Sequence, residues 1–133
     1  MRVSQWVAAS VERVYAAFVD PEQLLAWLPP EGMTGRMHRF DEQGYEMSLY
    51  YGTRVRVELR EPPFRLVETA VFESADPAFQ GEMRMTTTLE AVDGGTLVTL
   101  VHENLPPGVS EEDDEEGARS SLGQLARFVE GAG

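Results

Sequence analysis

The chain has 133 residues, a formal net charge of −12 and no cysteine. The length predicts one domain, residues 1–133, and the acidic balance argues against nucleic acid and anionic lipid as partners, because both carry negative charge. No apolar run approaches the ~20 residues of a membrane span, so we expect a cytoplasmic protein without a membrane span. Because the chain has no cysteine, we expect no disulfide and no thiolate metal site.

The N-terminal part of the chain predicts a strand followed by two short helices. Residues 2–7 alternate as a half-buried strand does. Ser10 can cap a first helix, in which apolar residues recur at helical spacing. Asp20 can cap a second helix, with Gln23 completing a capping box, and Pro29 with the proline after it ends that helix.

From Thr34 to Asn104 the hydrophobic period changes to 2, which is typical of antiparallel strands with one buried face. Turn residues divide this stretch into expected strands over about 34–40, 44–51, 53–61, 64–74, 80–92 and 95–104. Arg54, Arg56 and Arg60 share one face of the third of these strands. We interpret that face as outer and solvated; an anion or partner site is the alternative.

The C-terminal segment predicts one long amphipathic helix. Ser110 can cap it, and an apolar stripe from Ala118 to Val129 indicates a helix over about 111–130. Residues 111–116 are all acidic. Because the helix dipole stabilises carboxylates at a helix N-terminus, we interpret this run as a solvated helix start. A calcium site or a partner-docking patch is the alternative.

This order of elements comes with sequence segments that resemble a known superfamily. The segments are Val11–Phe18, Asp20–Glu22, Trp27–Met33, Phe72–Phe79, Leu89–Thr96, Glu103–Gly108 and Ser120–Leu122. The chain resembles the START/Bet v 1-like superfamily, also called SRPBCC, and within it the branch named for the activator of the heat-shock-protein-90 ATPase. The resemblance implies an α+β helix-grip fold. In this fold a curved antiparallel sheet of about seven strands wraps around a long C-terminal helix, and two short helices follow the first strand.

The same resemblance implies a cavity for hydrophobic small molecules between the sheet and the long helix. Many relatives carry a longer stretch where Tyr51-Gly52-Thr53 makes a tight turn here, so we expect a different pocket mouth. Trp27 is expected at that mouth, between the second helix and the sheet; a packing anchor is the alternative. The expected ligand-binding residues are Trp27, Tyr45, Met47, Tyr51, Glu68, Met83, Met85, His102 and Leu122. An ordinary packed core is the alternative for the aromatic and methionine side chains.

Glu68 and His102 are the candidate acid–base residues. Period 2 places His102 on the face of Val98 and Leu100, where it could bind a ligand carbonyl or transfer protons. A hydrogen-bonded histidine near the sheet end is the alternative. Glu68 points inward if Leu66 does, but the opposite face of its strand is also apolar. The direction of Glu68 therefore stays open.

We expect a binding protein without a cofactor that sequesters or senses a small hydrophobic or aromatic molecule. The first alternative is a polyketide cyclase/dehydratase-like enzyme that uses His102 and Glu68. The second is a co-chaperone-like ATPase activator. The sequence has no zinc-ligand pattern, Walker loop, dinucleotide fingerprint or nucleophile elbow, so we expect no metal site. Relatives often pair, so a homodimer also stays open.

Overall fold

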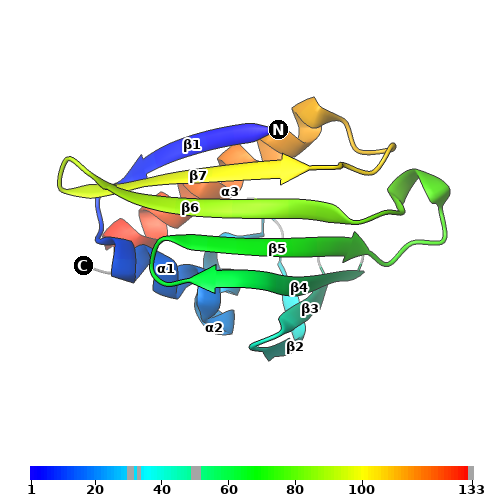
Figure 1. Cartoon of the computed structure of the whole chain (residues 1–133), viewed down its shortest axis with the longest axis horizontal. Helices are drawn as coiled ribbons and strands as arrows, with labels where there is room; N and C mark the ends of the chain where they lie inside the picture. Colours follow the sequence, from blue (N-terminus) through cyan, green and yellow to red (C-terminus); the bar gives the residue numbers. More distant parts are fainter. Residues whose placement is uncertain (30–31, 33, 49–51, 132–133) are drawn as a thin grey trace.

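The computed structural model describes residues 1–29, 32, 34–48 and 52–131. Its elements are β1 Arg2–Val7, α1 Val11–Val19, α2 Pro21–Trp27, β2 Arg36–Asp41, β3 Gly44–Ser48, β4 Gly52–Glu61, β5 Arg65–Phe72, a 3₁₀ turn Pro77–Phe79, β6 Met83–Val92, β7 Gly95–Glu103 and α3 Glu111–Gly131. The strands form one antiparallel sheet in the order β1-β7-β6-β5-β4-β3-β2 (Figure 1). The predicted α+β helix-grip fold is confirmed.

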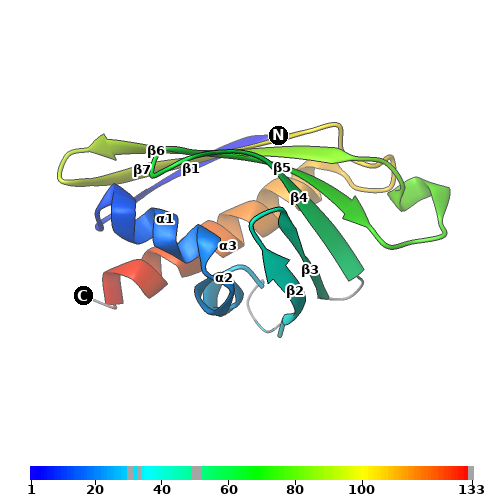
Figure 2. The same cartoon turned by 60° about the horizontal axis from the view of Figure 1, so that its bottom comes forward.

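All three α-helices lie on one side of the sheet, which curves around them (Figure 2). β4, β3 and β2 bend toward the helical side, and β1, β6 and β7 form the flatter part. α3 packs mainly against β1, whereas α1 packs against β6 and β7. The hydrophobic core lies between the concave face and the helices. Within the described ranges, no helix is both long and apolar enough to cross a membrane.

The predicted caps fix the helix starts. Ser10 Oγ accepts a hydrogen bond from the backbone N–H of Arg13 (3.2 Å), and Ser110 caps α3 in the same way. Asp20 Oδ1 accepts from the backbone N–H of Gln23 (3.1 Å). The side chain of Gln23 does not turn back to complete a capping box; its Oε1 accepts instead from Arg13 Nη1 (2.6 Å). This contact ties α2 to α1.

Several strand boundaries differ from the prediction: β2 spans Arg36–Asp41 rather than 34–40, and β5 spans Arg65–Phe72 rather than 64–74. Asp76 Oδ1 accepts from the backbone N–H of Ala78 (2.9 Å) and starts the 3₁₀ turn, so β6 begins at Met83 rather than near residue 80. The described part of β3 ends at Ser48; the last residues of the predicted strand 44–51 lie outside the described residues.

An irregularity in β4 reverses which side chains face inward near its end. Val57 pairs with Glu68, but the next pair is Leu59 with Val67, so one residue of β4 is left over between them. Leu59 therefore points outward and is 40% exposed. Arg60 turns to the inner face and is half-buried. The expectation of an outer, solvated Arg60 is wrong because the bulge shifts the alternation by one residue.

Candidate functional site

A cavity of about 510 Å³ lies between the concave face of the sheet and the N-terminal half of α3. The helical wall comes from α1, α2 and α3, and the sheet wall from β3 to β7. Its lining residues are Phe18, Leu24, Trp27, Leu28, Tyr45, Met47, Thr53, Val55, Glu68, Ala70, Phe72, Met83, Met85, Thr87, Leu100, His102, Val109, Asp113, Asp114, Gly117, Ala118 and Ser121. Most of these side chains are apolar, and the polar ones are few.

The two halves of α3 have different roles. Gly117, Ala118 and Ser121 in the first half line the cavity, and their small side chains leave space beside the sheet. Leu122 and Leu125 begin the second half, which packs tightly into the core. Leu122 is 1% exposed and is not part of the cavity wall, contrary to our expectation. The apolar stripe of α3 predicted burial but could not separate a filled core from a hollow one.

The expected aromatic and methionine residues form much of the remaining wall. Tyr45 and Met47 on β3 are buried, Met83 on β6 is buried, and Met85 is half-buried; all four line the cavity. Tyr51, which was expected beside them, lies outside the described residues. Flexible thioethers and aromatic rings therefore surround the space, which suits an irregular apolar molecule.

Trp27 closes the inner wall between α2 and the sheet and is not at the mouth. It is 1% exposed, and its Nε1 donates to the Ala17 carbonyl (2.9 Å). The ring packs edge-on against Phe18, with the centroids 4.8 Å apart. Two α3 side chains hold the end of α2: Ser121 Oγ donates to the Leu28 carbonyl (2.7 Å), and Gln124 Nε2 donates to the Trp27 carbonyl (2.8 Å). Trp27 is thus an anchor whose face also lines the cavity.

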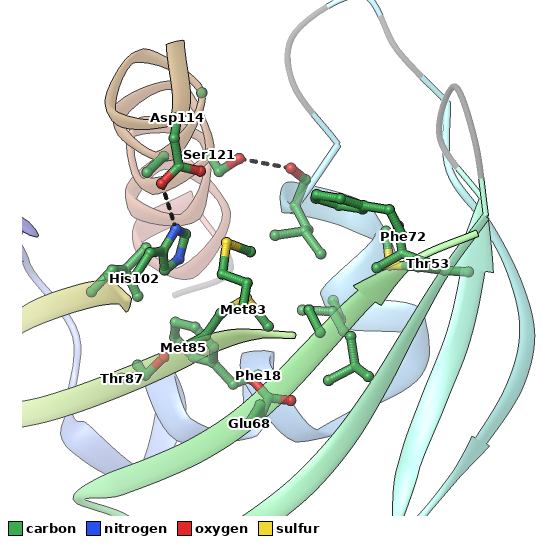
Figure 3. A pocket seen from close by; sticks show the side chains of 18 of the residues that line it. Phe18, Thr53, Glu68, Phe72, Met83, Met85, Thr87, His102, Asp114 and Ser121 are labelled. Carbon is green, nitrogen blue, oxygen red and sulfur yellow. Dashed lines mark hydrogen bonds and ion pairs between the residues drawn. The ribbon is translucent and has the colours of Figure 1, made fainter. Parts of the chain in front are cut away.

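Glu68 points into the cavity from the middle of β5 (Figure 3). It is 7% exposed, and no hydrogen bond or ion pair of its carboxylate occurs among the described residues. Burial raises the pKa of the Glu68 carboxyl to about 7, against an opposing effect of the nearby Arg60 guanidinium. The sequence left its direction open because the other face of β5 is also apolar, and Val67 on that face is in fact 1% exposed.

Two further polar atoms are buried near Glu68. Within the described residues, Tyr15 Oη and Arg60 Nε have no hydrogen-bond partner. Burial raises the pKa of Tyr15, with Arg60 lowering it and Glu68 raising it. Burial and then Glu68 also raise the pKa of Tyr45 well above its ordinary value. Glu68 therefore belongs to a group of desolvated polar side chains from α1, β3, β4 and β5.

His102 lines the cavity from the end of β7, and its ring contacts the first turns of α3. Nδ1 lies 2.9 Å from Asp114 Oδ2, and both side chains are largely buried (Figure 3). An ionised carboxylate only accepts hydrogen bonds, so the neutral ring donates from Nδ1 and keeps Nε2 as its acceptor.

Asp114 is a site residue that sequence reasoning missed. It stands within the acidic run that we interpreted as a solvated helix start, yet it and Asp113 line the cavity. The signal was available, because Asp114 lies four residues before Ala118 and eight before Leu122. Side chains at this spacing share one face of a helix. The acidic run is thus exposed only in part.

Glu68 and His102 face the same cavity without contacting each other. Glu68 pairs with Met85 across β5 and β6, and Met85 pairs with His102 across β6 and β7. Two strand spacings separate the backbones of Glu68 and His102, which amounts to about 10 Å. Met85 stands between them (Figure 3). A molecule in the cavity could contact both residues across this row.

A curved antiparallel sheet that holds a long C-terminal helix across such a cavity is a ligand-binding fold. The chain belongs to the family described as Activator of Hsp90 ATPase homolog 1-like protein, whose model matches residues 8–130. The predicted relationship is confirmed. No curated protein matches the sequence.

Solved structures share this fold over nearly the whole chain. Protein CV1439 from Chromobacterium violaceum is 31% identical, covering 98% of this chain and 96% of that chain with a TM-score of 0.92. DynU16, described as a protein in the dynemicin biosynthetic locus, is 24% identical over 98% of this chain and 46% of that chain, with a TM-score of 0.71. CalU16 from Micromonospora echinospora is 22% identical over 96% and 74%, with a TM-score of 0.70. The last two similarities show the fold alone.

Proposed function

We propose that this chain binds a small, mainly apolar molecule in the cavity between the sheet and α3. The cavity of about 510 Å³ is the observation that carries the proposal. Ligand sites typically measure about 300–1,000 Å³ and combine apolar walls with a few convergent polar groups. Here the walls are aromatic and methionine side chains, and the polar groups are Glu68 at one place and His102 with Asp114 at another.

Native mass spectrometry of the protein purified from its host tests this proposal. We expect the mass of a small molecule bound in stoichiometric amount and recoverable by extraction. The same spectrum reports whether a homodimer forms.

Two glycine variants make a matched pair for locating the bound molecule. A Cβ at Gly117 would enter open space at the cavity wall. A Cβ at Gly123 would meet only Arg127 Nη1 at 3.8 Å, away from the cavity. Gly117→Leu should therefore lose the bound molecule, whereas Gly123→Leu should keep it. Equal occupancy in the two variants would contradict binding in this cavity.

Catalysis is a second candidate function because of the His102–Asp114 contact. A carboxylate that orients an imidazole is a common arrangement for a general base. Glu68, with a pKa of about 7, can supply a proton from the other side of the cavity. A polyketide cyclase or dehydratase could use His102 as the base and Glu68 as the acid. His102→Ala should then abolish turnover of a polyketide-like substrate while the protein stays folded; unchanged turnover would contradict the assignment.

Two earlier expectations stay predictions. An ATPase-stimulation assay with the host chaperone tests the co-chaperone alternative. Fractionation of host cells tests a cytoplasmic location.

A further inference from the structure

We propose that the molecule bound in the cavity carries a basic amine, which pairs with the Glu68 carboxylate while its apolar body fills the remaining space. This inference rests on the proposed function and specifies the chemical class of its ligand.

The first argument is the state of Glu68 itself. Its side chain is buried, points into the cavity and has no hydrogen-bond or ion-pair partner among the described residues. An unpaired buried carboxylate is costly, and proteins normally compensate it with a cation or with several donors. Because the carboxylate opens toward the cavity, a ligand can supply the missing donor.

The second argument is the sign of the charged groups around the cavity. The acidic residues that line it are Glu68, Asp113 and Asp114, and among the described residues no arginine or lysine lines it. Arg60 acts on Glu68 electrostatically, but no ion pair within 4.0 Å joins the two, and Arg60 is not part of the cavity wall. A carboxylate ligand would therefore enter next to negative charge without a cation to receive it. An ammonium group would find a partner.

The third argument comes from His102, the histidine of the lining. The Asp114 carboxylate accepts the hydrogen bond from Nδ1–H, so the neutral ring offers an acceptor at Nε2. Where Glu68 is ionised, neither its carboxylate nor the neutral His102 ring at Nε2 presents a donor that could replace the water around a ligand carboxylate. Both favour a ligand that donates hydrogen bonds, and the charge of Glu68 favours a cationic donor over a neutral one.

Three probes with the same aromatic body test the inference: naphthylethylamine, naphthylethanol and naphthylacetate. Their dissociation constants are measured by calorimetry at about pH 8, where an ordinary alkylamine is protonated and most of Glu68 is ionised. We expect the amine to bind at least tenfold more tightly than the alcohol. Naphthylacetate should bind most weakly of the three.

Glu68→Gln keeps the shape of the side chain and removes its charge, so it should abolish the advantage of the amine while the alcohol still binds. Glu90→Gln is the matched control, because Glu90 is an exposed glutamate on β6 that does not line the cavity. This variant should retain the wild-type order of affinities.

The outcomes separate the inference from the proposed function. If the amine and the alcohol bind equally, or if the amine keeps its advantage in Glu68→Gln, the inference is overturned and the apolar cavity remains a binding site. The proposed function is wrong, and the inference falls with it, in either of two cases. In the first, Gly117→Leu binds all three probes as wild type does. In the second, the wild-type protein binds none of the three probes.

Discussion

Replacing Glu68 by glutamine should stabilise the ligand-free protein, and the gain should grow with pH. Burial raises the pKa of the carboxyl from 4.5 to about 7, although Arg60 opposes this rise. A tenfold change in proton affinity corresponds to about 1.4 kcal/mol. The ionised carboxylate therefore lowers the free energy of unfolding by about 3 kcal/mol. Glutamine is never ionised and avoids this cost.

The sign follows from proton binding. Between the unfolded value of 4.5 and the folded value of about 7, the folded protein holds a proton on Glu68 that the unfolded chain has released. The contribution of this residue to stability consequently falls as pH rises through that window and is level above it. Tyr15, Tyr45 and Arg60 face Glu68 from the neighbouring elements, and all three keep one charge state across the window.

Urea unfolding of wild type and Glu68→Gln at a series of pH values measures the difference directly. The two free energies of unfolding should be similar near about pH 4 and differ by about 3 kcal/mol near about pH 8. Glu90→Gln, with its exposed carboxyl, should show little pH-dependent difference from wild type. A Glu68→Gln difference that is constant with pH, or a variant less stable at high pH, would refute the reasoning.

Three other variants test local parts of the structure. Gly123→Ala should raise the free energy of unfolding by about 0.5–1 kcal/mol, because the helix interior gains a methyl group that meets only Arg127 Nη1 at 3.8 Å; a loss would reveal crowding. Asp20→Ala should lower it by about 1 kcal/mol through loss of the α2 cap, and an unchanged value would show that the cap contributes little. Asp114→Ala should free the His102 ring, so nitrogen NMR should show one tautomer in wild type and a mixture in the variant; identical spectra would mean that Asp114 does not fix the ring.

The predictable features of this fold were local ones. The helix starts were predictable because each cap is a hydrogen bond between a side chain and the backbone N–H only three residues later, at Ser10, Asp20 and Ser110. The change of period near residue 34 separated helices from strands in the same way. The position of the cavity was less accessible, because an apolar stripe looks the same whether the space beside it is filled, as at Leu122, or open, as at Ala118.

The side-chain directions that prediction got wrong or left open depend on contacts between distant segments. Arg60 faces inward because β5 leaves one residue of β4 unpaired, and nothing within β4 alone reveals this shift. The direction of Glu68 could not be predicted because both faces of β5 carry apolar residues. Val67, on the face opposite to Glu68, is also buried, and it pairs with Leu59 on β4 and Thr86 on β6. Asp114 differs, since helical spacing from Ala118 placed it on the buried face and its acidic neighbours obscured that signal.

The stability cost of Glu68 and the proposed amine site are linked through the same carboxylate. A bound ammonium group stabilises the ionised form, so in the occupied protein the fall in stability between pH 4.5 and about 7 should shrink. A ligand at about one hundred times its dissociation constant stabilises a protein by about 2.7 kcal/mol, which is close to the cost of about 3 kcal/mol in the empty fold. Saturation with naphthylethylamine should therefore raise the stability of wild type near about pH 8 toward that of empty Glu68→Gln. Naphthylethanol, if it binds more weakly at the same concentration, should produce a smaller rise. Equal rises from the two probes would mean that the carboxylate receives no charge-specific partner in the cavity.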